Sequence, residues 1–149
     1  MAEKVLIIGC GWLGQQLAPV LAAAGYQVFG SRRTQAAAEA LPAPLQGIAL
    51  DFQSPWSAAQ LALFQDAWLI CTIPPGARQG GESDYPQVLQ QLAQLAQAAG
   101  IKGGIHISST GIYQGLSGVV NERSELQLTQ PRVALLAAGE QALQQQVNW

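Results

Sequence analysis

The chain has 149 residues, of which 49% are hydrophobic and only 11% charged, with a formal net charge of -2. This length predicts one domain, residues 1–149, with a single core. The weak negative charge excludes a general nucleic-acid-binding protein, which needs a basic face. Two cysteines and one histidine exclude a disulfide framework and the common multi-histidine metal sites, so we predict no metal. No apolar run approaches the roughly 20 residues that span a bilayer, and no cleavage site follows the N-terminus, so we expect a cytoplasmic protein without a membrane partner.

Short apolar runs alternate with helical patterns along the chain. The pattern predicts strands at 5–8, 26–29 (ending at Gly30), 47–50, 67–73 and 105–108. It predicts helices at 12–24, 34–41, 57–64, 84–99 (with Asp84 as its cap) and 131–147, and loops at 74–83 and 110–130. Such alternation predicts an α/β fold, a doubly wound parallel sheet of the Rossmann type. The most continuously apolar strands, at 5–8, 67–73 and 105–108, are expected at its centre, with Cys10 and Cys71 close to the edge that binds a cofactor.

A glycine loop directly follows the first expected strand and opens the first expected helix. Its residues 9–14, Gly-Cys-Gly-Trp-Leu-Gly, fit the pattern G-x-G-x-x-G. Gly9 would permit the tight turn, Gly11 the close approach of a pyrophosphate, and Gly14 the packing of helix on sheet. The free N–H groups of the helix, including those of Trp12 and Leu13, would bind the phosphates. The loop therefore predicts a dinucleotide cofactor.

The end of the second expected strand indicates which dinucleotide is bound. NAD-specific domains commonly carry a carboxylate here, which binds the ribose hydroxyls, whereas this chain has Ser31, Arg32 and Arg33. Arginine offers a fork of donors to phosphate oxygens. The sequence therefore predicts NADP(H) in preference to NAD(H).

Two further segments are predicted to contact the cofactor. Asp51 and Phe52, just past the third strand, could hold the adenine between an acceptor and an apolar face. The second segment ends the fourth strand and comprises Thr72, Ile73 and Pro74.

These features resemble the extended short-chain dehydrogenase/reductase superfamily, the NAD-dependent epimerase/dehydratase group, and especially its atypical members. Besides the glycine loop and Asp51, the resemblance rests on residues 107–113 (ISSTGIY), 121–122 (NE) and 138–141 (AGEQ). It implies that Ser109, four residues before Tyr113, hydrogen-bonds a substrate oxygen. Ser109 is the one catalytic candidate. A hydroxyl that satisfies the backbone at a strand end is the alternative, and His106, inside a strand, is expected to be a packed residue.

The chain departs from this family in two respects. Members normally carry Tyr-x-x-x-Lys at the start of the last helix, for proton exchange with the substrate, but Arg132 and Leu136 stand at those positions. Extended members also continue with a sixth strand and a substrate region, so the chain looks like the cofactor-binding half of a longer protein, and we expect no activity from it alone.

Three functional hypotheses remain open. The first is an NADP-binding domain of an epimerase-, dehydratase- or reductase-like protein, acting on a sugar nucleotide or carbonyl compound. The second is a non-catalytic sensor of the dinucleotide or an interaction module. The third is the N-terminal domain of a hydroxyacid or ketoacid reductase, suggested by residues 69–75 (LICTIPP) and disfavoured by the segment 107–113. We also predict that the helices 84–99 and 131–147 present Leu, Val and Ala outward and pair in a homodimer.

Overall fold

The computed structural model describes residues 1–76, 83–146 and 149. Its centre is a parallel sheet of five strands in the order β3-β2-β1-β4-β5. The strands are β1 (Lys4–Ile8), β2 (Gln27–Arg32), β3 (Gln46–Ala49), β4 (Ala67–Cys71) and β5 (Gly103–His106). This arrangement confirms the predicted Rossmann-type α/β fold, including the neighbouring positions of the first and fourth strands.

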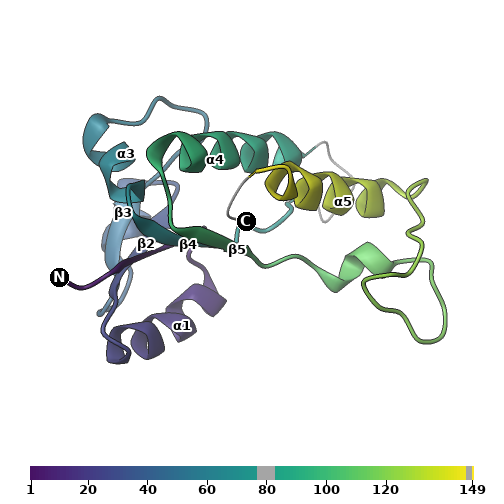
Figure 1. Cartoon of the computed structure of the whole chain (residues 1–149), viewed down its shortest axis with the longest axis horizontal. Helices are drawn as coiled ribbons and strands as arrows, with labels where there is room; N and C mark the ends of the chain where they lie inside the picture. Colours follow the sequence, from purple (N-terminus) through teal and green to yellow (C-terminus); the bar gives the residue numbers. More distant parts are fainter. Residues whose placement is uncertain (77–82, 147–148) are drawn as a thin grey trace.

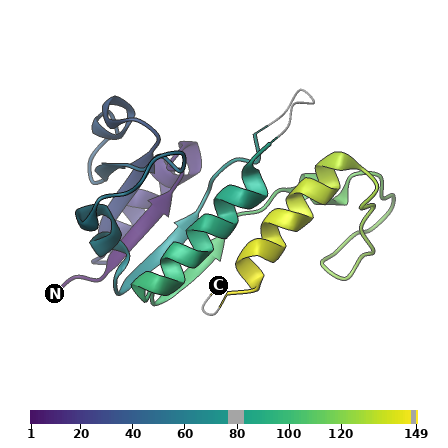
Figure 2. The ribbon, with the colours of Figure 1, turned by 90° about the horizontal axis from the view of Figure 1, so that it is seen from above.

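Helices cover the two faces of the sheet, with α1 on one face and α3, α4 and α5 on the other (Figure 1). Their bounds are α1 (Trp12–Ala23), α2 (Gln35–Glu39), α3 (Ala58–Phe64), α4 (Tyr85–Ala99) and α5 (Pro131–Gln144), and a 3-10 turn, η1 (Thr110–Tyr113), follows β5. Figure 2 shows α4 crossing the sheet and α5 beside it, farther from the centre. One hydrophobic cluster fills each face, so the sheet is the middle layer of the molecule.

Several predicted element ends shift for reasons that the strand pairing explains. The second strand does not end at Gly30 but runs to Arg32, because Ser31 and Arg32 pair with Ile48 and Ala49 of β3. The fourth strand ends two residues early, at Cys71, which is the last residue paired with β1. The fifth strand begins and ends two residues earlier than predicted.

The described part of the predicted loop at 74–83 has no helix or strand. Its residues 77–82, and Val147 at the predicted end of the last helix, lie outside the described residues.

The prediction that the fifth strand is central was wrong. Among the described strands, β5 pairs only with β4 and forms an edge of the sheet. Its side chains Ile105 and, just beyond it, Ile107 are 60% and 40% exposed, and Trp68 of β4 is 40% exposed. Helix α1 packs on β2, so the apolar residues of β4 and β5 on its face are only partly covered. The apolar composition of residues 105–108 reflects that face and not a central place in the sheet.

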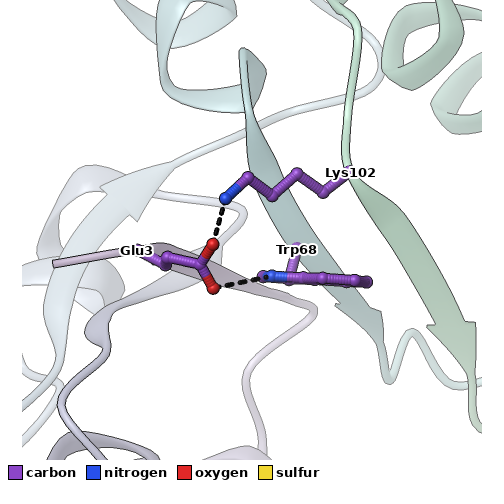
Figure 3. Close-up of polar contacts among 3 residues, drawn as sticks. All are labelled: Glu3, Trp68 and Lys102. Atoms are coloured by element: carbon purple, nitrogen blue, oxygen red, sulfur yellow. Dashed lines mark hydrogen bonds and ion pairs between the residues drawn. The ribbon is translucent and has the colours of Figure 1, made fainter.

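A polar cluster joins the amino ends of three neighbouring strands (Figure 3). The indole N–H of Trp68 donates to Glu3 Oε2 at 3.2 Å, and the Lys102 ammonium forms an ion pair with the same carboxylate. Together these contacts lower the pKa of Glu3. The cluster holds the Trp68 ring, which extends from β4 toward β5 (Figure 3).

Helices α4 and α5 pack on each other, and this contact alters the prediction about their outward faces. The leucines and valines that were expected outside are buried or half-buried. The exposed positions of the two helices are Gln87, Gln90, Gln94, Gln97, Ala98, Pro131, Ala138, Gln141 and Gln144. The outward prediction therefore holds for some of the alanines and is wrong for leucine and valine. A homodimer through these helices stays a prediction.

Both cysteines are buried close to the carboxyl ends of the central strands. Cys71 ends β4 and pairs with Ile8 of β1. Cys10 lies two residues after Ile8, so both cysteines lie near the same edge of the sheet, as predicted from the neighbouring positions of strands one and four. They belong to the hydrophobic clusters of opposite faces. Burial raises the pKa of both thiols, that of Cys71 to about 12.

Within residues 1–76, 83–146 and 149, no helix has the length and hydropathy to cross a membrane. In the same residues, no group of three or more His, Cys, Asp or Glu side chains could hold a metal ion.

Candidate functional site

The glycine loop has the geometry that its sequence predicted. Gly9 has a φ of +77°, and a Cβ there would lie 2.9 Å from the Cα of Ile73. A Cβ on Gly14 would lie 2.8 Å from both Cys10 Sγ and Ile7 Cγ2, so only glycine lets α1 approach the sheet this closely. A Cβ on Gly11 would meet only Gly9 O, at 3.9 Å. The space beside the Gly11 backbone, where a side chain would stand, is therefore open.

Helix α1 begins immediately after this opening. Gly11 is its N-cap, no side chain caps its first turn, and no acidic residue lies there. The first N–H groups of the helix are thus left for an anion. Trp12, the first residue of α1, is 77% exposed.

Ser31 has a structural role that the sequence did not reveal. Its side chain is 3% exposed, and its hydroxyl accepts a hydrogen bond from Gly9 N–H at 2.9 Å. Its carbonyl accepts from Cys10 N–H, also at 2.9 Å. Ser31 therefore fixes the conformation of the glycine turn from the neighbouring strand. A serine at a strand end gives no sequence signal for this contact, because the strand pairing creates it.

Two guanidinium groups follow Ser31. Arg32 is half-buried, and its Nε is buried without a hydrogen-bond partner among the described residues. Arg33 is exposed. Both line a cleft of about 370 Å³ at the carboxyl ends of the strands, where ligands of open α/β sheets bind.

Asp51 and Phe52 line the same cleft. The Asp51 carboxylate accepts from Gln53 N–H at 3.0 Å and from the Ser54 hydroxyl at 3.2 Å, so it shapes its own turn. The ring of Phe52 packs edge-on against Trp56, with centroids 4.9 Å apart. This turn therefore places a hydrogen-bond acceptor, the Asp51 carboxylate, next to an aromatic ring, that of Phe52.

The end of β4 closes the cleft from the other side. Ile73 and Pro74 line it, whereas the Thr72 hydroxyl turns back and donates to Gly9 O at 3.0 Å. The predicted residues that the described cleft brings together are Gly9, Ser31, Arg32, Arg33, Asp51, Phe52, Ile73 and Pro74. The predicted residues that do not line it are Gly11, Trp12, Leu13, Gly14, Thr72 and Ser109.

Sequence reasoning missed the contribution of α4 to this cleft. Tyr85 and Val88 of α4 line it, and so do Leu50, Gln53, Pro75, Gly76, Ser83 and Asp84. Asp84 is the N-cap residue as predicted, but its side chain does not cap the helix and accepts from Gln53 Nε2 at 2.9 Å. The available sequence signal was the proline-rich segment after the fourth strand, of which Pro75 and Gly76 line the cleft.

Tyr85 links the cleft to the interior. Its hydroxyl lies 3.1 Å from His106 Nε2, and its ring occupies the space that a Cβ on Gly139 of α5 would need. Burial raises the pKa of Tyr85 to about 12. Burial also lowers the pKa of His106, against the opposing effect of Glu140. His106 is therefore a half-buried histidine that is hydrogen-bonded through Nε2, whereas its Nδ1 is buried without a partner among the described residues.

Ser109 lies outside the described cleft, at the start of η1. Its hydroxyl accepts from Gly111 N–H at 3.2 Å and caps the 3-10 turn. A Cβ on Gly111 would lie 3.3 Å from Ser109 Oγ and 3.1 Å from Arg132 Nε. Arg132 of α5 and Ser109 thus lie on either side of Gly111.

Comparison with known proteins agrees with this architecture. A family model described as NAD(P)H-binding matches residues 9–148. Protein YeeZ of Escherichia coli strain K12 is 34% identical over 153 residues, and the match covers 99% of this chain and 53% of that protein. Protein YeeZ of Escherichia coli O157:H7 gives the same values. The chain spans about half the length of these curated relatives.

Solved structures show the same fold. UDP-glucuronic acid 4-epimerase from Bacillus cereus, in complex with UDP-glucuronic acid and NAD, has a TM-score of 0.73 and 25% identity, over 94% of this chain and 51% of that one. A putative NAD-dependent epimerase/dehydratase from Methylobacillus flagellatus has a TM-score of 0.71 and 26% identity, over 96% and 50%. With its glycine loop, sheet order and matched family model, the chain belongs to the NAD(P)H-binding family.

Proposed function

We propose that this chain binds NADP(H) in preference to NAD(H), with the 2′-phosphate against Ser31, Arg32 and Arg33. The observation that carries the proposal is the buried Arg32 Nε, which has no partner among the described residues. A buried donor without an acceptor typically destabilises the fold by about 1–3 kcal/mol. A phosphate oxygen would satisfy this N–H, and Arg33 would add a second charge-assisted contact.

The rest of the cofactor fits the remaining features of the site. The open backbone at Gly11 and the uncapped first turn of α1 suit the pyrophosphate. Phe52 offers an apolar face for adenine, and Asp51 retains acceptor capacity beyond its two hydrogen bonds. Ile73 and Pro74 would bound the cofactor on the side of β4.

The experiment is a calorimetric titration of the intact chain with NADPH and with NADH at the same moderate salt concentration. Charge-assisted contacts contribute about 1.5–3 kcal/mol each before losses to solvent, so we expect NADPH to bind roughly ten- to a hundredfold more tightly. Equal affinities would show that the arginines are only a solvated strand end. No binding of either cofactor would contradict the proposal as a whole.

We further propose that the chain is the cofactor-binding part of an epimerase-, dehydratase- or reductase-like protein. The dinucleotide, when bound, supplies hydride exchange. Ser109 would hydrogen-bond the substrate oxygen, since its hydroxyl proton is not used in the contact with Gly111. With Arg132 and Leu136 at the positions of the usual tyrosine and lysine, the 149 residues would bind cofactor without turning over a carbonyl compound.

A further inference from the structure

We propose that Asp84, held in place by Gln53, selects the base of the dinucleotide by accepting a hydrogen bond from the 6-amino group of adenine. This inference rests on the proposed cofactor function, because it assigns the base specificity of the same cleft. Both side chains line the cleft. Gln53 Nε2 donates to Asp84 Oδ2 at 2.9 Å, so the pair joins the turn after β3 to the start of α4.

The Asp84 carboxylate does not serve the helix that it precedes. Asp84 is the N-cap residue of α4, a position from which an aspartate side chain commonly accepts a backbone N–H of the first turn. Here the side chain makes no such bond. It instead accepts from Gln53, which stands 31 residues earlier in the chain. The position of this carboxylate therefore follows from the cleft and not from the helix end.

An apolar side chain stands beside each member of the polar pair. Val88 lies one helical turn after Asp84, so the two share a face of α4, and both line the cleft. Phe52 directly precedes Gln53 and also lines the cleft. A flat base between Phe52 and Val88 would therefore present its polar edge to Asp84 and Gln53.

The carboxylates of this cleft can only accept hydrogen bonds when they are ionised. Asp51 already accepts from Gln53 N–H and from the Ser54 hydroxyl, one bond to each of its oxygens. Asp84 uses Oδ2 for Gln53, and its Oδ1 accepts no hydrogen bond from the described part of the chain. Neither carboxylate forms an ion pair within residues 1–76, 83–146 and 149. A base that binds here must therefore supply an N–H group.

Adenine meets this requirement and hypoxanthine does not. The 6-amino group of adenine is a donor, whereas a 6-oxo group is an acceptor. A 6-oxo group would leave the Asp84 oxygen unpaired and would face it with a second acceptor. A site that hydrogen-bonds an N–H group of its ligand rejects the analogue that lacks this group. Because Asp84 is exposed, water limits the expected preference to about tenfold.

The test is a calorimetric titration of the intact chain with NADPH, with NADH and with their deamino analogues, in which hypoxanthine replaces adenine. We expect each adenine dinucleotide to bind about tenfold more tightly than its analogue. Asp84→Asn should remove this preference, because the amide N–H groups can donate to a 6-oxo group while the amide oxygen still accepts from Gln53. Equal affinities for NADPH and deamino-NADPH in the unmodified chain would overturn the inference.

The matched control is Asp66→Asn, which removes the same charge from an exposed position outside the cleft. Asp66 has a φ of +55°, a conformation that asparagine tolerates, so this variant should keep the preference for adenine. The same ratio of affinities in Asp84→Asn as in Asp66→Asn would overturn the assignment of Asp84.

A second variant, Gln53→Met, tests the residue that holds Asp84. It removes the donor to the carboxylate and keeps an unbranched side chain. We expect the preference for adenine to fall while NADPH still binds, because Asp84 is then free to turn toward water. An unchanged ratio of affinities would overturn the part assigned to Gln53.

The four titrations separate this inference from the proposed function. The preference for NADPH over NADH depends on the 2′-phosphate, whereas the preference over the deamino analogues depends on the base. If NADH and NADPH bind equally, but both more tightly than their analogues, the NADP(H) proposal fails and the inference stands. If NADPH is preferred to NADH but not to its own analogue, only the inference fails. No binding of any of the four would contradict both.

Discussion

The Ser31 hydroxyl accepts a hydrogen bond from the backbone N–H of Gly9 at 2.9 Å, and this contact joins the end of β2 to the turn after β1. The same serine accepts from Cys10 N–H through its carbonyl. The strand end that faces the proposed 2′-phosphate and the turn that faces the proposed pyrophosphate are thus one hydrogen-bonded unit. A change at Ser31 should therefore be felt at both ends of the cofactor site.

Replacing Ser31 by alanine should destabilise the chain and weaken binding of both cofactors. The variant leaves a part-buried Gly9 N–H without its acceptor, for which about 1–2 kcal/mol is expected in the free energy of unfolding. Urea unfolding and NADPH titration measure the two effects. The control is Ser54→Ala, which removes an exposed hydrogen bond to Asp51. Unchanged stability and affinity in Ser31→Ala would show that the turn holds its shape without the serine.

Alanine at Gly11 and alanine at Gly14 should act on different properties. At Gly14 the added Cβ would lie 2.8 Å from Cys10 Sγ and Ile7 Cγ2, and overpacking of this kind destabilises by about 1–3 kcal/mol. At Gly11 it would meet only Gly9 O at 3.9 Å, so the fold should be kept while close approach of the pyrophosphate is lost. Thermal unfolding and cofactor titration of both variants make the comparison. Full cofactor affinity in Gly11→Ala would remove the pyrophosphate from this position.

The double variant Arg32→Ala/Arg33→Ala should lose the preference for NADPH. Its affinity for NADPH is expected to fall roughly ten- to a hundredfold, because two charge-assisted contacts with the phosphate disappear. Affinity for NADH should hardly change. The exposed Arg123→Ala serves as a control for the altered net charge. A parallel loss of both affinities would mean that the arginines stabilise the site generally and do not select the cofactor.

His106 should make the stability depend on pH in a defined window. Burial lowers its pKa in the folded chain below the ordinary 6.5, so the unfolded chain takes up the proton first as the pH falls. The contribution is fully present above about pH 6.5 and is lost toward the lower folded-state pKa. It is the only histidine, and carboxylates titrate lower, near pH 4.

Urea unfolding between about pH 8 and pH 5.5 measures this dependence. His106→Gln offers the Tyr85 hydroxyl a hydrogen-bonding side chain that does not titrate, and it should flatten the curve. A curve of the same steepness in the variant would assign the pH dependence to other groups.

The fold and the glycine loop could be predicted from the sequence because both depend on local patterns. Apolar runs separated by helical periodicity define the alternation of strand and helix, and the Gly9, Gly11 and Gly14 spacing has meaning only at a strand-to-helix turn. The arginines past Gly30 were likewise visible, since they stand close to the end of the second strand.

The tertiary structure alone decided which residues meet across the sheet. Pairing with β3 carries β2 through Ser31 to Arg32, and in this strand the Ser31 hydroxyl reaches the backbone N–H of Gly9. Strand order placed β5 at an edge although Ile105 and Ile107 are apolar, because the hydrophobicity of single residues does not report the number of neighbouring strands. The placement of Arg132 and Ser109 on either side of Gly111 brings together residues 23 positions apart, from the start of a 3-10 turn and the start of a helix. Such contacts depend on how helices and strands pack, and a linear pattern carries no record of that packing.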